Sequence, residues 1–64
     1  MELFIEKKGK RIKVKFTGLV KDLLVKFDIN PESVIVVRNK EVITEDERLE
    51  DSDSVDILSV VSGG

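Results

Sequence analysis

The chain has 64 residues with a formal net charge of −2, and 41% of its residues are apolar and 38% charged, which is typical of one small globular domain. It contains no Cys and no His, which excludes disulfides, zinc, haem and iron–sulfur sites, and His-activated Ser or Cys nucleophiles. We therefore expect no metal site, no stably bound cofactor and no enzymatic activity, in a protein that acts through partners.

The first predicted element is a β-hairpin. Residues 3–5 are apolar, and Lys7-Lys8-Gly9-Lys10 is a polar turn in which glycine can take a positive φ. Residues 11–16 then alternate strictly, which predicts a strand that buries one face through Ile12, Val14 and Phe16.

A helix is predicted next, because the apolar period changes after Gly18. The apolar side chains of this segment form one stripe of a helix, at Leu19, Val20, Leu23, Leu24 and Phe27. Thr17 is the expected N-cap. The helix should end near Phe27 or Asp28, since Asn30-Pro31 disfavours its continuation.

Three strands are predicted in the second half of the chain. Residues 34–37 are a run of β-branched side chains, typical of a strand with little solvent on either side. A tight turn at Asn39-Lys40 leads to a short strand over 41–43, and residues 55–61 form the last strand. Residues 44–54 are polar except for Leu49, which we expect to anchor an irregular loop.

The resulting order, β-β-α-β-β-β, is an α+β arrangement with one helix packed on one face of a mixed sheet. We expect the first and last strands to be central and parallel. The N-terminal hairpin then lies on one side of them and the pair of short strands on the other. We expect a single domain over residues 1–64, in which 62–64 form a flexible tail.

The order, the length and the terminal glycines resemble the ubiquitin-like β-grasp fold, and within it the ThiS/MoaD sulfur-carrier family. The compact loops are nearer to ThiS. One departure is Ser52, where the family commonly has glycine. The matching segments are residues 19–24, 30–39, 49–58 and 60–64.

The resemblance implies that an E1-like adenylyltransferase of the ThiF/MoeB type activates the carboxyl group of Gly64 with ATP and Mg²⁺. A cysteine desulfurase or rhodanese-type donor then converts it to a thiocarboxylate, and an acceptor such as thiazole synthase takes the sulfur for thiamin. Independently of the family, Gly63 suits a chain end that threads a narrow channel, because glycine has no Cβ, and Ser62 is the first residue of this threading tail.

Three alternatives use the same sequence features. The carrier could supply molybdopterin synthesis or tRNA thiolation instead of thiamin. The chain could be a protein modifier of the ubiquitin or SAMP type, in which Gly64 forms an isopeptide bond to a lysine. It could also be a β-grasp interaction module with an inert tail.

A partner-docking patch is expected on the sheet face that the helix leaves uncovered. If Leu3 and Ile5 face the helix, Phe4 points to the opposite side, and Leu58 and Val60 join it. An uncovered apolar patch on a small domain is typical of a protein-binding surface.

Charge is unevenly divided between the two halves of the chain. Residues 1–32 hold eight basic and five acidic residues (+3), and residues 33–64 hold three and eight (−5), which sum to −2. We interpret the basic hairpin as a solvated sheet edge and not as a nucleic-acid site, since it lacks stacking groups. The acidic residues 45–56 are interpreted as a solvated loop, or as a surface that steers the chain toward a basic groove on the activating enzyme.

With no transmembrane segment and no signal peptide, we expect a cytoplasmic monomer.

Overall fold

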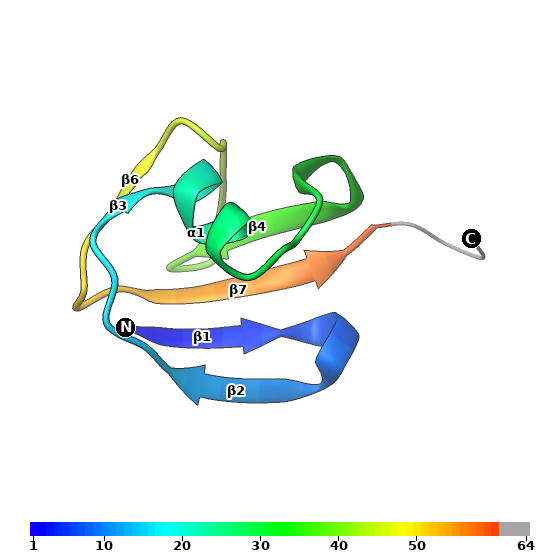
Figure 1. The fold of residues 1–64 in the computed structure, drawn as a ribbon, viewed down its shortest axis with the longest axis horizontal. Helices are drawn as coiled ribbons and strands as arrows, with labels where there is room; N and C mark the ends of the chain where they lie inside the picture. Colours follow the sequence, from blue (N-terminus) through cyan, green and yellow to red (C-terminus); the bar gives the residue numbers. More distant parts are fainter. Residues whose placement is uncertain (61–64) are drawn as a thin grey trace.

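The computed structural model describes residues 1–60 and shows one mixed five-stranded sheet with a single α-helix on one face (Figure 1). The strand order is β2-β1-β7-β4-β5, and β3 and β6 form a separate two-stranded ladder. The helix α1 spans Val20–Lys26, and the 3₁₀ turns η1 and η2 span Glu6–Lys8 and Pro31–Ser33. The strands are β1 (Glu2–Ile5), β2 (Lys10–Lys13), β3 (Gly18–Leu19), β4 (Val34–Arg38), β5 (Glu41–Ile43), β6 (Arg48–Leu49) and β7 (Ser54–Ser59).

The first and last strands form the parallel central pair, as the sequence predicts. Leu3 pairs with Val55 and Ile5 pairs with Ile57, so the buried positions of both strands face the helix together. The hairpin strand β2 forms one edge of the sheet and β5 the other. This arrangement confirms the order of the six elements that the hydrophobic periods predict and agrees with the β-grasp fold that the resemblance implies, while the short strands β3 and β6 were not predicted.

The core lies between the sheet and α1. Three positions of the predicted helical stripe, Val20, Leu23 and Leu24, are buried, and Leu49 is fully buried as the expected anchor of its loop. Burial of one such side chain contributes about 1.5–3 kcal/mol. The buried set is Leu3, Ile5, Val20, Leu23, Leu24, Val36, Leu49, Val55 and Ile57.

The predicted N-cap at Thr17 is wrong. Leu19 precedes the helix, and no side chain caps it. Instead, the backbone N–H groups of Val20 and Lys21 donate to the carbonyl oxygens of Glu47 and Glu45, at 2.9 and 3.0 Å. A loop distant in sequence thus satisfies amides that the helix leaves without partners.

Two predicted strands differ in extent from the structure. The second strand ends at Lys13 instead of Phe16. Val14 still exchanges backbone hydrogen bonds with Met1, but the Phe16 N–H donates to a carboxylate oxygen of Asp51 and not to a neighbouring strand. The last strand ends at Ser59 within the described residues. The turn at Asn39 and Lys40 is confirmed, and both residues have positive φ values.

The prediction that β4 is shielded on both faces is wrong. Val36 is buried against the core, whereas the neighbouring Ile35 is 38% exposed. With one helix, only one face of the sheet is covered, so a continuous apolar strand leaves alternate side chains on the open face. No helix in residues 1–60 is long and apolar enough to cross a membrane.

Candidate functional site

The predicted reactive end, Gly64, and the tail residues Ser62 and Gly63 lie outside the described residues. The structure does describe the point at which this tail leaves the domain. The Ser59 N–H donates to the Glu6 carboxylate at 2.8 Å, and the Val60 N–H donates to the Ser33 carbonyl at 3.1 Å. Two elements on opposite sides of β7 therefore hold the last residues before the tail.

Glu6 occupies this position because β1 ends one residue earlier. The parallel register between β1 and β7 stops at Ile5 and Ile57, where the chain turns into η1. The turn closes at Gly9, whose N–H donates to the Glu6 carbonyl and whose φ is +60°. The Glu6 side chain then takes the place of the backbone acceptor that a longer β1 would supply. Sequence analysis missed Glu6, although a Glu directly after a central strand could have indicated this role.

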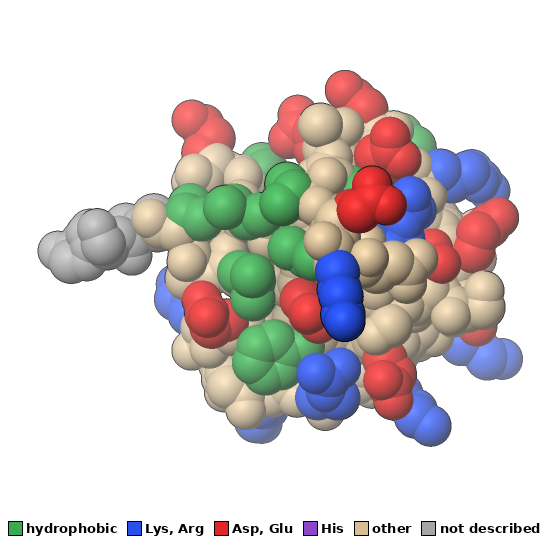
Figure 2. Space-filling view, turned by 180° about the vertical axis from the view of Figure 1, so that it is seen from behind, with side chains coloured by type: hydrophobic (Ala, Val, Ile, Leu, Met, Phe, Trp, Pro, Cys, Tyr) green, Lys and Arg blue, Asp and Glu red, His purple; other side chains and the backbone are tan. Residues whose placement is uncertain are grey.

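The expected docking patch lies on the sheet face opposite the helix. Phe4 is opposite Asp56 in the parallel register, so Leu58, two residues further along β7, is its diagonal neighbour on that face. Val60 follows the end of β7 and is 44% exposed. Figure 2 shows apolar side chains gathered on the uncovered face of the molecule.

The patch is larger than the sequence predicted. Ile35 lies directly opposite Leu58, and Val42 lies opposite Val37 on the same face. Val42 is 71% exposed. These side chains continue the apolar surface from β1 to the far edge strand β5. They were missed because residues 34–37 were expected to be buried on both faces.

Basic side chains border the patch along the edge strand β2. The Arg11 guanidinium lies over the Phe4 ring, 5.4 Å from its centroid, and also approaches the Glu2 carboxylate at 3.8 Å. A cation over an aromatic face is a weakly stabilising contact at an exposed site. Lysines on an exposed edge strand disfavour pairing with other chains, in agreement with the interpretation of this hairpin as a solvated edge.

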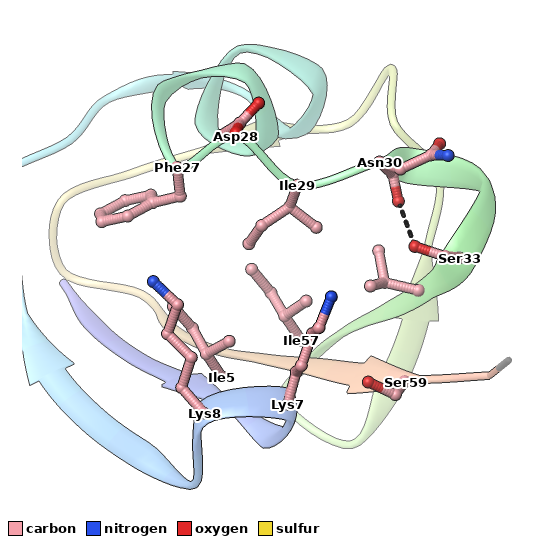
Figure 3. Close-up of a pocket in the computed structure, with 11 residues that line it drawn as sticks. Ile5, Lys7, Lys8, Phe27, Asp28, Ile29, Asn30, Ser33, Ile57 and Ser59 are labelled. Carbon is pink, nitrogen blue, oxygen red and sulfur yellow. Dashed lines mark hydrogen bonds between the residues drawn. The ribbon is translucent and has the colours of Figure 1, made fainter. Parts of the chain in front are cut away.

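A groove of about 890 Å³ opens on the helix side of the sheet, next to the tail exit (Figure 3). Its apolar walls include Ile5, Phe27 and Ile29, and Ser59 lines the end from which the tail leaves. Lys7 and Lys8 extend from η1 on one side, facing Phe27 and Ile29 on the other. This groove is separate from the apolar patch, which lies on the opposite face of the sheet.

The acidic loop over residues 44–53 lies at the other end of the molecule, beside β3 and β6 (Figure 1). Two of its carboxylates, on Glu47 and Asp53, pair with Arg38 at 3.5 and 3.7 Å. A third, on Asp51, accepts the Phe16 N–H at 2.9 Å, which lowers the pKa of Asp51. The acidic loop therefore lies at the opposite end of β7 from Ser59. Within residues 1–60, no group of three or more acidic side chains is placed to hold a metal ion.

Comparison with known proteins identifies close relatives over almost the whole chain. The model of the ThiS family matches residues 4–64. The sulfur carrier protein TtuB of Thermus thermophilus is 33% identical over 86% of this chain and 85% of its own. The sulfur carrier protein ThiS of Bacillus subtilis is 39% identical over 88% of this chain and 92% of its own.

The fold agrees with solved structures of the same kind. The crystal structure of the thiamine biosynthesis protein ThiS from Geobacter metallireducens superposes with a TM-score of 0.65. The two chains are 28% identical, and the match covers the whole of both. An NMR structure of a thiamine biosynthesis protein from the same organism gives a TM-score of 0.62 at 26% identity, with all of this chain and 88% of that chain covered.

Proposed function

The chain belongs to the ThiS family of sulfur carrier proteins, and we propose that it carries sulfur as a thiocarboxylate on the C-terminal carboxyl group of Gly64. The observation that carries the proposal is the family match, which extends through Gly63 and Gly64 to the last residue. Like its relatives, the protein is a carrier and not a catalyst.

The chemistry needs a partner enzyme. A carboxylate is a poor acyl donor, so an E1-like adenylyltransferase of the ThiF/MoeB type would join the Gly64 carboxylate to the α-phosphate of ATP, with Mg²⁺, and release pyrophosphate. Sulfur from a cysteine desulfurase or rhodanese-type donor would then take the place of AMP. Gly63 would let the chain end pass a narrow channel, since it has no Cβ.

We infer that the uncovered sheet face is the docking surface for the activating enzyme. Phe4 and Leu58 lie side by side on it, and Ile35 extends the apolar area across β4. The tail leaves from β7, the strand that carries Leu58. An enzyme seated on this face would therefore hold the strand from which the reactive end emerges.

Thiamin thiazole synthesis is the pathway that we propose, with thiazole synthase as the sulfur acceptor and the cytoplasm as the location. Support comes from relatives that are named ThiS and described as thiamine biosynthesis proteins. The similarity to TtuB keeps other sulfur-transfer pathways, molybdopterin synthesis and tRNA thiolation, as the second candidate. A modifier of the SAMP type would use the same activated glycine.

Mass spectrometry of the chain purified from its native cells tests the proposal. Replacement of one oxygen by sulfur at Gly64 is the expected result for a carrier. Branched Gly-Gly-lysine peptides on other proteins would instead identify a modifier. Finding neither, in cells that make the protein during thiamin-limited growth, would contradict both and indicate an inert tail.

A further inference from the structure

The groove beside the tail exit is the feature from which we draw a further inference. The Ser59 N–H donates to the Glu6 carboxylate and the Val60 N–H donates to the Ser33 carbonyl, and both serines also line the groove. A protein that binds the chain at these residues therefore lies next to this groove. The inference rests on the proposed function, because it concerns the enzyme that activates Gly64.

Covering the groove has an electrostatic consequence. Lys7 and Lys8 stand on its wall, and within residues 1–60 neither ammonium group has a carboxylate within 4.0 Å. Removing a cation from water is costly unless an anion accompanies it. Asp28 lines the groove as well, but it stands on the opposite wall with Phe27 and Ile29 (Figure 3).

The acidic loop of the chain does not supply the missing anions. It lies at the start of β7, whereas the lysines lie at its end. The six residues of β7 separate the two regions by roughly 15–20 Å, at about 3.3 Å per residue. Within residues 1–60 no carboxylate, Asp28 on the facing wall included, lies within 4.0 Å of either ammonium group, so the counter-ion expected on binding is a carboxylate of the partner.

The geometry points to an acidic segment of the activating enzyme as the occupant of the groove. This segment places an apolar side chain against Ile5, Phe27 and Ile29 and a carboxylate within reach of Lys7 and Lys8. The contact in the groove is a second contact, on the face opposite the apolar patch. The enzyme thus contacts both faces of β7, the strand that precedes the tail.

A matched pair of charge-reversal variants tests the inference with the full chain and its adenylating enzyme. The first variant is Lys7→Glu/Lys8→Glu. The second, Lys21→Glu/Lys26→Glu, changes the net charge equally but lies on α1, outside the groove lining and away from the apolar patch. All four lysines are exposed, so both variants should keep the melting temperature of the parent.

The groove variant should bind the enzyme at least about tenfold more weakly by calorimetry, and the control less than about threefold, since rim charges away from a contact change affinity little. Equal weakening by both variants would overturn the inference and indicate general charge steering. Unchanged binding by the groove variant would overturn the groove contact alone. No binding by the parent chain would overturn the proposed function together with it.

A photo-crosslinker at position 8 identifies the occupant directly. Benzoylphenylalanine in place of Lys8 should crosslink to a segment of the enzyme that contains Asp or Glu beside an apolar residue. A crosslink to residues 61–64 of the same chain, to a second copy of the chain, or to a segment without acidic residues would overturn the inference.

Discussion

The carboxylate of Glu6 accepts a hydrogen bond of 2.8 Å from the backbone N–H of Ser59, although 53 residues separate the two in sequence. The bond continues the parallel β1–β7 ladder by one step after the β1 backbone has turned away into η1. It thereby fixes the last strand one residue before Val60. Ser59 and Val60, the last described residues, are held by this side chain on one side and by the Ser33 carbonyl on the other.

Replacement of Glu6 by Ala should loosen the tail exit without unfolding the domain. The Ser59 N–H would lose its acceptor, so its hydrogen exchange should accelerate by up to about tenfold, in line with about 0.5–1.5 kcal/mol for one hydrogen bond. ATP–pyrophosphate exchange should show a higher KM for the carrier. The control is Glu6→Gln, whose amide oxygen still accepts the bond. If Glu6→Ala left the hydrogen exchange of the Ser59 amide unchanged, the hydrogen bond between Glu6 and Ser59 would not form in solution.

Changes at the last residue should abolish activation while the fold is retained. Every buried side chain of the described core lies between Leu3 and Ile57, so neither Gly64→Ala nor removal of Gly64 should lower the melting temperature measurably. Adenylation, measured as ATP–pyrophosphate exchange, should fall to background, because the added Cβ or the shortened chain displaces the carboxyl group. Normal adenylation of the shortened chain would disprove the assignment of Gly64 as the reactive residue.

A carboxylate introduced into the apolar patch should weaken binding to the activating enzyme, whereas one introduced elsewhere on the surface should not. Phe4→Asp and Leu58→Asp place a carboxylate at the centre of the patch and should each weaken binding to the activating enzyme by about 2 kcal/mol or more, the range of an interface hot spot. The matched control is Val25→Asp on α1, which is 77% exposed and points away from both surfaces. Calorimetry should show normal binding for the control, and circular dichroism should show that all three variants fold. Equal losses at Val25 and Phe4 would exclude a localised patch.

The sequence was sufficient to predict the architecture because each element has its own hydrophobic period. The alternation over residues 11–16 and the helical stripe at Leu23 and Leu24 predict which side chains face the core, and the lone Leu49 predicts the anchor of its loop. The details that it missed depend on contacts between distant segments. The helix start at Val20 is set by carbonyl oxygens of the 44–53 loop, and no local pattern encodes them.

The candidate site was predictable only in part, for a similar reason. Alternation placed Phe4 and Leu58 on one face, but the extension through Ile35 depends on knowing that a single helix cannot cover both faces of β4. The hydrogen bond from Ser59 to Glu6 and the position of Lys7 beside the groove both depend on the residue at which β1 ends. Hydrophobic periods do not fix strand ends to that accuracy.

Truncation of the loop anchor should destabilise the whole domain. Leu49 is fully buried and is one of the two residues of β6. This strand pairs with β3, which directly precedes the helix. Leu49→Ala should lower the free energy of unfolding by about 2–5 kcal/mol, from lost burial and the cavity that remains. Urea unfolding measures the change. Val42→Ala, at an exposed apolar position, is the control and should change it by less than about 0.5 kcal/mol.

Acidification should remove the contribution of Asp51 to stability. Asp51 accepts the Phe16 N–H at 2.9 Å and faces the N-terminal ammonium group at 3.3 Å, and the hydrogen bond from Phe16 is the main cause of a pKa below the ordinary 3.8. Because the folded state lowers this pKa, the stabilisation is fully present above pH 3.8 and is lost as the pH falls through the lower, folded-state value.

Asp51→Asn keeps an acceptor for Phe16 but has no charge to titrate. The melting temperature of the variant should therefore lie below that of the parent at neutral pH, and the difference should shrink under acidic conditions. A difference that stays constant down to the acid unfolding limit would show that Asp51 does not stabilise the fold through its charge.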